Sequence, residues 1–292
     1  METRWLYVSS DEFSKLRKEA KGVCVLPMGC VEKHGYHLPL GVDVFEAEGL
    51  AYQASQIETV CVFPTFIFGD VPENYPTMPA GSVTLSMDTE FLLLEQLCDQ
   101  IARNGFKKII IFNSHGGNRG LLSVFLRKLE NKPHDYVVVV VHMMSDIAGR
   151  IGKCIEEEGR ERFPYMTDSD VETVLMYYKE KKKSSGHAVF GETAYTFGIH
   201  PETVKMERMG TIDGTPLKLS QKFKDAGIDI RDGGFFVNCP HCISGPEPTD
   251  VTEGIGKAAV EVEAERIANA YKVIKEDEDL IRWHNENWKT NI

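Results

Sequence analysis

The sequence predicts an α/β protein, built as a three-layer α/β/α sandwich around a mostly parallel sheet. Strand and helix patterns alternate over the first 142 residues, which is typical of parallel strands joined by helical crossovers. The run YVVVVV at residues 136–141 is apolar throughout, which predicts a strand buried on both faces in the centre of such a sheet. With 292 residues, no repeat and no clean boundary, we expect one domain over residues 1–292.

Composition argues against two classes of partner. A net charge of -11 at pH 7 argues against a nucleic-acid surface, and the basic run KEKKK at residues 179–183 is typical of a solvated helix end. No apolar stretch approaches the ~20 residues that span a bilayer, and the N-terminus has no signal-peptide core. We therefore expect a cytoplasmic protein without a membrane partner. Its seven scattered cysteines indicate reduced thiols.

The first elements are predicted from their apolar periodicity. Residues 10–21 form an amphipathic pattern that stops at Gly22, and residues 23–28 follow as a fully apolar strand. Helix-like spacing returns over residues 44–57, and residues 60–68 indicate a second buried strand. These elements make up one strand–helix–strand unit.

A long loop separates this unit from the next. Residues 69–83 contain three prolines and two glycines, and loops of this length in compact domains tend to be functional. A helix capped by Asp88 follows, then a strand over residues 108–112, the loop NSHGGNRG at residues 113–120, and a further helix.

The second half shows weaker patterns. A helix is predicted to begin at Asp168 or Asp170 and to run to about Lys179, and a long one to begin at Asp250 or Thr252. Between them, the region 184–248 is rich in Gly and Pro. We expect it to form loops and short strands folded back over the sheet.

Metal-type side chains follow two of the predicted strands. The stretch PMGCVEKHGYHLPLGVD at residues 27–43 places Glu32 and His34 just past the first strand, and His115 lies just past the strand over residues 108–112. Ligands of open parallel sheets collect at the carboxyl ends of the strands, so these side chains should meet at one edge. Asp43 begins the next helix and can reach the same space. Carboxylates and imidazoles in such loops predict a divalent metal site.

Three ordered motifs carry a resemblance to a known family. The stretch 27–43 is similar to the creatininase (creatinine amidohydrolase) signature, roughly P-x-G-S-x-E-x-H-G-x-H-L-P-L-x-x-D. NSHGGN at residues 113–118 resembles the family's N-G-H-G-G-N, and GHAVFGETA at residues 186–194 resembles its H-A-G-x-x-E-T-S element. The resemblance covers most of the chain.

The resemblance implies a two-metal hydrolase with an α/β/α sandwich that assembles as a homohexamer. Family members use two divalent ions, which are zinc, manganese or iron. Glu32 and His115 would hold one ion, His34 the other, and Asp43 would bridge them. The resemblance also assigns two catalytic residues, His187 and Glu192.

The chemistry of such a site is consistent with that division. A bound divalent ion brings the pKa of water from ~15.7 to near neutrality, so hydroxide forms as the nucleophile. A second ion can polarise an amide carbonyl. The leaving nitrogen still needs a proton, and a histidine with an ordinary pKa near ~6.5 can supply it. We therefore expect His187 to act as general acid and base.

The sequence departs from the family pattern at a ligand position. Creatinine-hydrolysing members have a metal-binding glutamate where this chain has Gly117. His34 and Asp43 remain as ligands of the second ion, and either Glu192 or water completes it, or that ion binds weakly. The H-G-G-N form is similar to branches that act on other substrates, such as formamidopyrimidine deformylases.

Other substitutions leave the proposed ligands in place. Cys30 and Lys33 depart from motif one, and Val189 and Ala194 depart from motif three.

Further candidates have two interpretations each. His37 is a substrate contact or a residue that fixes the loop by hydrogen bonding, and Glu73 and Tyr75 line the pocket or only pack their loop. His142 has the position of a metal residue but fits a core histidine better. Cys239 and Cys242 in CPHC have redox spacing but precede ISGPEP, which cannot continue as a helix.

The predicted function is hydrolysis of a non-peptide C–N bond in a small cyclic amide or formamide by a metal-activated hydroxide. Two alternatives remain open at this point. The same metal site could open a cyclic ketone or a sugar-like ring, or the chain could be a metal-binding member without turnover. The expected partners are a small-molecule substrate and further copies of the chain.

Overall fold

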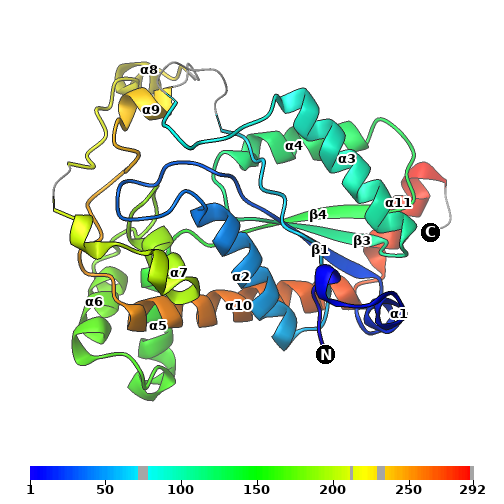
Figure 1. Cartoon of the computed structure of the whole chain (residues 1–292), viewed down its shortest axis with the longest axis horizontal. Coiled ribbons are helices and arrows are strands. Elements are labelled where there is room, and N and C mark those ends of the chain that lie inside the picture. The colour runs from blue at the N-terminus through cyan, green and yellow to red at the C-terminus, as the bar shows by residue number, and fades with distance from the viewer. Residues whose placement is uncertain (72–77, 211–212, 229–233, 290–292) are drawn as a thin grey trace.

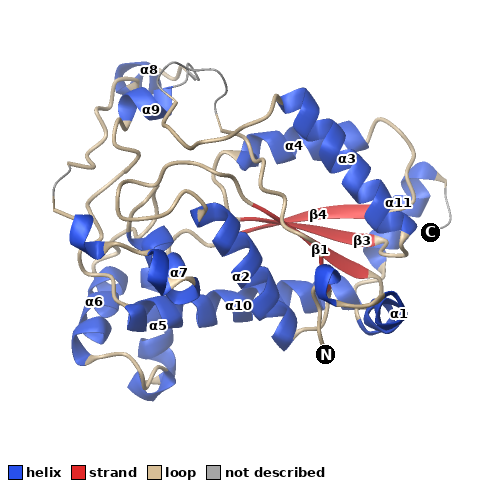
Figure 2. Ribbon diagram, in the orientation of Figure 1, coloured by secondary structure: helices blue, strands red, loops and turns tan. Residues whose placement is uncertain are grey.

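The computed structural model describes residues 1–71, 78–210, 213–228 and 234–289. Its centre is a four-stranded sheet in which all paired strands run parallel, in the order β2-β1-β3-β4. Figure 2 shows the strands in red between two sets of helices. The strands are β1 (Val23–Met28), β2 (Cys61–Val62), β3 (Lys108–Asn113) and β4 (Val137–His142).

One face of the sheet packs against the first set of helices. Cys24, Leu26 and Met28 of β1 alternate with Val23 and Val25, so the two groups face opposite sides. The side with Leu26 packs against three helices, and Figure 1 shows two of them, α3 and α4, together over the sheet. These helices are α1 (Ser10–Glu19), α3 (Met87–Arg103) and α4 (Asn118–Leu129).

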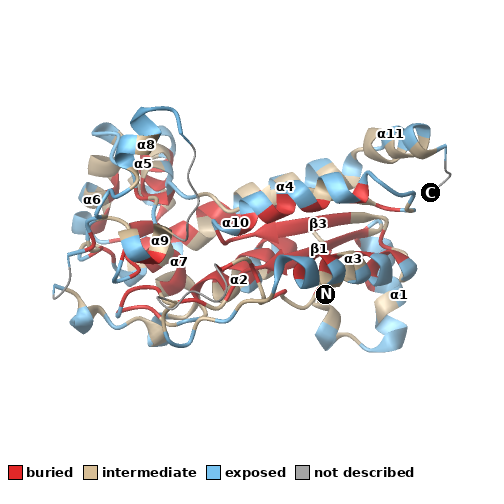
Figure 3. Cartoon of the chain, turned by 90° about the horizontal axis from the view of Figure 1, so that it is seen from above, coloured by how far each residue is buried: buried red, intermediate tan, exposed pale blue. Residues whose placement is uncertain are grey.

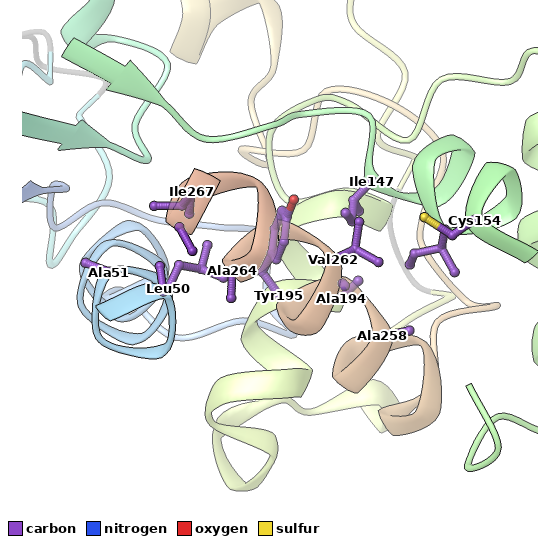
Figure 4. Packing of buried hydrophobic residues seen from close by; sticks show 14 of the residues in the cluster. Leu50, Ala51, Ile147, Cys154, Ala194, Tyr195, Ala258, Val262, Ala264 and Ile267 are labelled. Carbon is purple, nitrogen blue, oxygen red and sulfur yellow. The ribbon is translucent and has the colours of Figure 1, made fainter. Parts of the chain in front are cut away.

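The other face carries the larger core. In Figure 4, Leu50 of α2, Tyr195 of α7 and Ile267 of α10 lie in one apolar cluster. A Cβ built on Gly198 would lie 2.2 Å from the backbone oxygen of Gly256, so α7 and α10 approach more closely than larger residues would allow. The helices of this layer are α2 (Val42–Ile57), α5 (Ile147–Glu158), α7 (Phe190–Ile199) and α10 (Glu253–Glu276). The sheet and its two helical layers confirm the predicted α/β/α fold class.

The remaining helices lie at the edges of these layers, and α6 contributes the buried Val174 to the larger core. Figure 3 shows exposed residues on the outer sides of α6, α8 and α11, while the strands are buried or intermediate. The elements are α6 (Asp168–Lys179), α8 (Gln221–Asp225), α9 (Gly234–Asn238), α11 (Asp279–Trp288) and the short 3-10 helices η1 (Trp5–Tyr7), η2 (Arg160–Arg162), η3 (Pro201–Thr203) and η4 (Met206–Arg208). Among the described residues, no helix combines the length and apolarity needed to cross a bilayer.

Two strand predictions were wrong in detail. β4 is the last strand in the sheet order rather than a central one, and every residue in it is half-buried. The strand predicted over residues 60–68 is reduced to Cys61–Val62, followed by an isolated bridge between Met28 and Phe66. Pro64 lies between them and has no backbone N–H to donate to a ladder.

The helix predictions were more accurate. α6 and α10 begin after Thr167 and Thr252, whose side chains accept hydrogen bonds from the first turn of each helix. The cap of α3 is Ser86 rather than Asp88. The region 184–248 differs most, because it contains the buried helix α7 and no strand among its described residues.

Candidate metal centre

Four segments bring the predicted side chains to one end of the sheet. β1 leads into a loop that contains Glu32 and His34, and β3 leads to His115. Asp43 lies in the first turn of α2. Figure 1 shows α7 beyond the strands on this side of the molecule, so residues before and within it can cover the loops.

The first group of side chains is deeply buried. His115 Nδ1 lies 3.2 Å from Glu32 Oε1 and 3.5 Å from Asp43 Oδ2. The Cys30 thiol donates a hydrogen bond to Asp43 Oδ2 at 3.1 Å. One ligand atom from each of these four residues lies within 4.8 Å of the others, so a single ion could contact all of them.

A second group shares Asp43 with the first. His34 Nε2 lies 3.6 Å from Asp43 Oδ2 and 3.5 Å from Glu192 Oε2. His34 is fully buried, whereas the Glu192 side chain is 17% exposed and lies at the outer edge. Asp43 is therefore placed between two sets of ligand-type atoms.

His187 lies over both groups. Its ring stacks on His34 with 4.1 Å between centroids, and its Nδ1 is 3.6 Å from Glu32 Oε1. Glu32, His34 and His187 form a third set with ligand spacing. Its backbone N–H donates to Ser244 Oγ at 2.6 Å, which ties it to the chain beyond α9.

Each histidine in the cluster is oriented by a backbone carbonyl. His115 Nε2 donates to the Asp70 oxygen at 2.9 Å, His187 Nε2 to the Lys33 oxygen at 2.8 Å, and His34 Nδ1 to the Glu32 oxygen at 3.2 Å. The carbonyls can only accept, so these nitrogens carry the proton. In the neutral ring, the other nitrogen faces the carboxylates and keeps a lone pair that a metal ion could take. This is how metal-binding histidines are usually held.

Small residues and side-chain amides position the loops. A Cβ on Gly29 would lie 2.5 Å from the Asp43 backbone, so glycine lets the start of α2 approach the end of β1. Ser114 Oγ donates to the Asp43 carbonyl at 2.7 Å. Asn113 donates to the His115 carbonyl at 2.8 Å and accepts from Asn118 at 2.9 Å, which fixes the turn that contains His115.

Gly117 cannot gain a side chain without rearrangement. A Cβ there would lie 2.4 Å from His115 Nε2 and 2.5 Å from the Asp70 oxygen. These are the two atoms of the hydrogen bond that orients His115. The packing of this loop therefore requires glycine at position 117, where creatinine-hydrolysing members of the family have a glutamate.

The charges of the cluster compensate one another. Burial alone would raise the pKa of Asp43, but His115 and His34 hold it well below its ordinary value. Glu32 follows the same pattern, with its pKa lowered by His115 and His187 against the effect of burial. Burial opposes the charged form of His115, yet Cys30, Glu32 and Asp43 raise its pKa well above the ordinary value. In the metal-free centre, protons on the histidines compensate the charge of the buried carboxylates, and a bound cation could take over that role.

Polar atoms at the centre of the cluster lack hydrogen bonds. Among the described residues, Glu32 Oε1, Asp43 Oδ1 and His34 Nε2 are buried without a hydrogen-bond partner, although ion-pair distances are short. Buried polar atoms are otherwise almost always paired. Ligand atoms held about 2.0–2.3 Å from a tetrahedral ion stand roughly 3.3–3.8 Å apart, close to the spacings of both groups. The cluster therefore fits a divalent metal centre.

The remaining candidates lie around the cluster or apart from it. His37 is buried, and its Nε2 lies 3.0 Å from Thr193 Oγ1, so this side chain joins the loop to α7. Burial lowers the pKa of His37 to about 4. His142 Nδ1 accepts from Asn113 at 3.2 Å and belongs to none of the three sets. The substrate-contact predictions at Glu73 and Tyr75 lie outside the described residues.

The CPHC segment packs rather than ligates. Cys239 and Cys242 are buried free thiols, and they follow α9 instead of opening a helix. The Cys242 carbonyl accepts a hydrogen bond from Gly35 N–H at 2.9 Å, and its side chain shares an apolar cluster with Cys30. This turn therefore supports the loop that contains Glu32 and His34.

Glu46 was not predicted from the sequence. It lies on α2 one turn after Asp43, fully buried, and neither carboxylate oxygen has a hydrogen-bond partner within the described chain. Burial, followed by the charges of Glu192 and Asp43, raises its pKa well above the ordinary value, which favours the protonated form. Its spacing from Asp43 was the available signal, but helix residues three apart are too common to be informative.

A basic cavity lies apart from this cluster. It has a volume of about 710 Å³ between α5 and α6 and is lined by Arg150, Lys153 and the lysines of the 179–183 run. Lys181, Lys182 and Lys183 are exposed, as expected of a solvated helix end. The cavity contains none of the sets with ligand spacing.

Comparison with known proteins relates the chain to one family. The family model described as creatinine amidohydrolase matches residues 7–271. Curated protein sequences gave no match.

Several solved structures share the fold. A Bacteroides fragilis NCTC 9343 protein, named as a candidate creatinine amidohydrolase, is 18% identical with a TM-score of 0.67, covering 95% of this chain and 99% of that one. A creatininase mutant complexed with creatine is 18% identical with a TM-score of 0.63, covering 95% and 100%. A structure named creatininase Mn is 16% identical with a TM-score of 0.61, also covering 95% and 100%. At identities this low, the comparisons with solved structures show that the fold is shared and no more.

Proposed function

The chain belongs to the creatininase family and is a metal-dependent amidohydrolase, and from this premise we propose that it hydrolyses a non-peptide C–N bond in a small cyclic amide or formamide. One observation carries the proposal. Three histidines each donate one ring N–H to a backbone carbonyl and direct the other ring nitrogen at buried carboxylates. Some oxygens of these carboxylates have no hydrogen-bond partner among the described residues. Such an arrangement is suited to two divalent ions that share one carboxylate.

We assign the ligands from the two groups. Glu32 and His115 would hold the first ion, His34 the second, and Asp43 would bridge them. Glu192 would complete the second ion, because its Oε2 is 3.5 Å from His34 Nε2 while Gly117 offers no side chain. Zinc, manganese or iron would suit these nitrogen and oxygen ligands. When bound, the ions would supply a nucleophile from water near neutral pH and polarise the amide carbonyl.

His187 would move the proton that the reaction needs. Its Nε2–H is held by the Lys33 carbonyl, so the proton exchanged with substrate is carried at Nδ1, which faces Glu32. The stack on His34 fixes the plane of the ring. Nδ1 would take a proton from the attacking water and deliver it to the leaving nitrogen. Glu192 contacts the Ala188 N–H, so it would also hold the segment that carries His187.

Family membership also suggests the domain organisation and the quaternary structure. We propose that residues 1–292 form one domain and that six copies of the chain assemble into a homohexamer. Light scattering on the purified chain tests it, and a monomer would refute it.

The function is tested by a substrate screen on metal-reconstituted protein. Small lactams, formamides and cyclic ketones are offered, and product is quantified with and without a chelator. The proposal expects chelator-sensitive turnover of an amide or a formamide. Turnover of ketones alone would refute the proposed bond class, and metal uptake with no turnover of any class would indicate a non-catalytic member.

A further inference from the structure

One thiol lies inside the first group of ligands. Cys30 is fully buried, directly follows Gly29 at the end of β1, and its Sγ is 3.1 Å from Asp43 Oδ2. Its Sγ is also within 4.8 Å of the ligand-type atoms of Glu32 and His115. The family pattern described above has serine at this position, so the sulfur is a property of this chain.

A second observation marks this space as a ligand site. Glu32 is 3% exposed and Asp43 is 1% exposed, yet Glu32 Oε1 and Asp43 Oδ1 have no hydrogen-bond partner among the described residues. The thiol satisfies only Oδ2 of Asp43. The thiol therefore borders a pocket of unsatisfied acceptors rather than a closed hydrogen-bond network.

We propose that Cys30 is a thiolate ligand of the first ion, alongside Glu32, Asp43 and His115, and that it favours thiophilic ions such as zinc, cobalt or cadmium over manganese. The inference rests on the metal centre proposed above. As the metal–sulfur bond forms, the S–H bond breaks and its proton passes to solvent. Thiolates prefer soft and borderline ions, whereas manganese prefers oxygen ligands.

The surroundings of Cys30 favour one orientation of the sulfur. Cys30 shares an apolar cluster with Val71, Phe236 and Cys242. Sγ itself donates to Asp43 and lies within ligand spacing of Glu32 and His115, so the sulfur faces the first group of ligands. The simpler role, a hydrogen-bond donor to Asp43 that serine could replace, predicts no metal–sulfur bond.

Cobalt separates the two roles. Cobalt(II) is added to metal-free protein, and the near-ultraviolet region is examined for a thiolate-to-cobalt charge-transfer band. We expect the band in the natural chain and its loss in Cys30→Ser, which keeps the weaker visible bands of bound cobalt. Cys242→Ser is the matched control, since Cys242 is a buried thiol of the same apolar cluster outside the ligand sets, and it should retain the band.

Two further measurements keep the test decisive. Competition with a chromophoric chelator should show zinc affinity reduced roughly 10–100-fold in Cys30→Ser, with manganese affinity much less affected. X-ray absorption of the zinc-loaded natural chain needs no variant and should show one sulfur at about 2.3 Å. Bound metal without sulfur in its shell would overturn this inference and leave the metal centre standing. Failure to bind any metal would overturn both.

Discussion

The two halves of the candidate centre are held by different parts of the fold. The strand-end half comes from the loops after paired strands and from the first turn of a long helix, and consists of Glu32, His34, Asp43 and His115. His187 and Glu192 come from a segment with positive φ at Gly186 and Ala188, joined to the rest by Ser244 and the Lys33 carbonyl. The strand-end half is fixed by the register of the sheet. The covering half, which consists of His187 and Glu192, is fixed by loop contacts. Binding of the first ion should therefore survive changes in the covering half, whereas proton transfer should not.

The largest effect is expected when the residue common to both ions is changed. Asp43→Asn removes the charge that both groups share, so metal analysis should show both ions lost or reduced below one per chain. Activity should fall about 10⁴-fold or more, because bound ions supply several kcal/mol of transition-state stabilisation. Full metal content in this variant would show that Asp43 does not bridge.

His187→Ala tests the covering half directly. The variant should bind metal as the natural chain does, since His187 is outside the strand-end group, and should lose rate by ~10²–10⁴-fold. If metal content falls with the rate, His187 is a ligand in the set with Glu32 and His34 instead.

Glu192→Gln lies between these cases, because it belongs to the cover but reaches an ion. One ion per chain should remain, and the affinity for the other should fall roughly 10–100-fold. Isothermal titration with zinc would resolve the two steps. Two unchanged binding steps would show that water, rather than Glu192, completes the second ion.

The pH dependence of the metal-free protein probes the strand-end half. The pKa values of His34 and His115 are raised, so their stabilisation is complete below pH 6.5 and is lost as the pH rises through the raised values. The pKa values of Glu32 and Asp43 are lowered, so their contribution is present above their ordinary values and is lost in acid.

The melting temperature should therefore decrease on the alkaline side by roughly 2–4 °C or more in the presence of a chelator. Excess zinc should abolish this decrease, because the cation replaces the protons. A chelated protein whose melting temperature does not change above neutral pH would contradict this electrostatic description.

The smallest effect is expected at Glu46, the matched control for Asp43. Because the pKa of this unpartnered carboxyl is raised, it destabilises the fold increasingly as pH rises above 4.5. Glu46→Gln should keep both ions and raise the melting temperature by about 2–4 °C. Loss of metal in Glu46→Gln would mean that the centre extends further along α2.

The strand-end half was accessible from sequence, and the cover was not. Apolar runs located β1 and β3, and the rule for parallel sheets then brought Glu32, His34 and His115 together. α7 escaped detection because FGETAYTFGI contains two glycines and few strong helix formers. Its helix is stabilised by burial against α2 and α10. Only the resemblance indicated His187 and Glu192.

β4 shows a different limit. Its valines pack against both helical layers, so the strand itself was correctly predicted from the apolar run. Such a run does not specify where a strand lies in the sheet. Cys30 shows another: a thiol in a strand-end loop has no spacing that separates a ligand from a packed core residue.

Anomalous diffraction from metal-soaked crystals tests the central claim most directly. Two peaks are predicted per chain, one contacting Glu32, Asp43 and His115, and the other contacting His34, Asp43 and Glu192. A single peak, or none near Asp43, would contradict a centre of two ions bridged by that carboxylate.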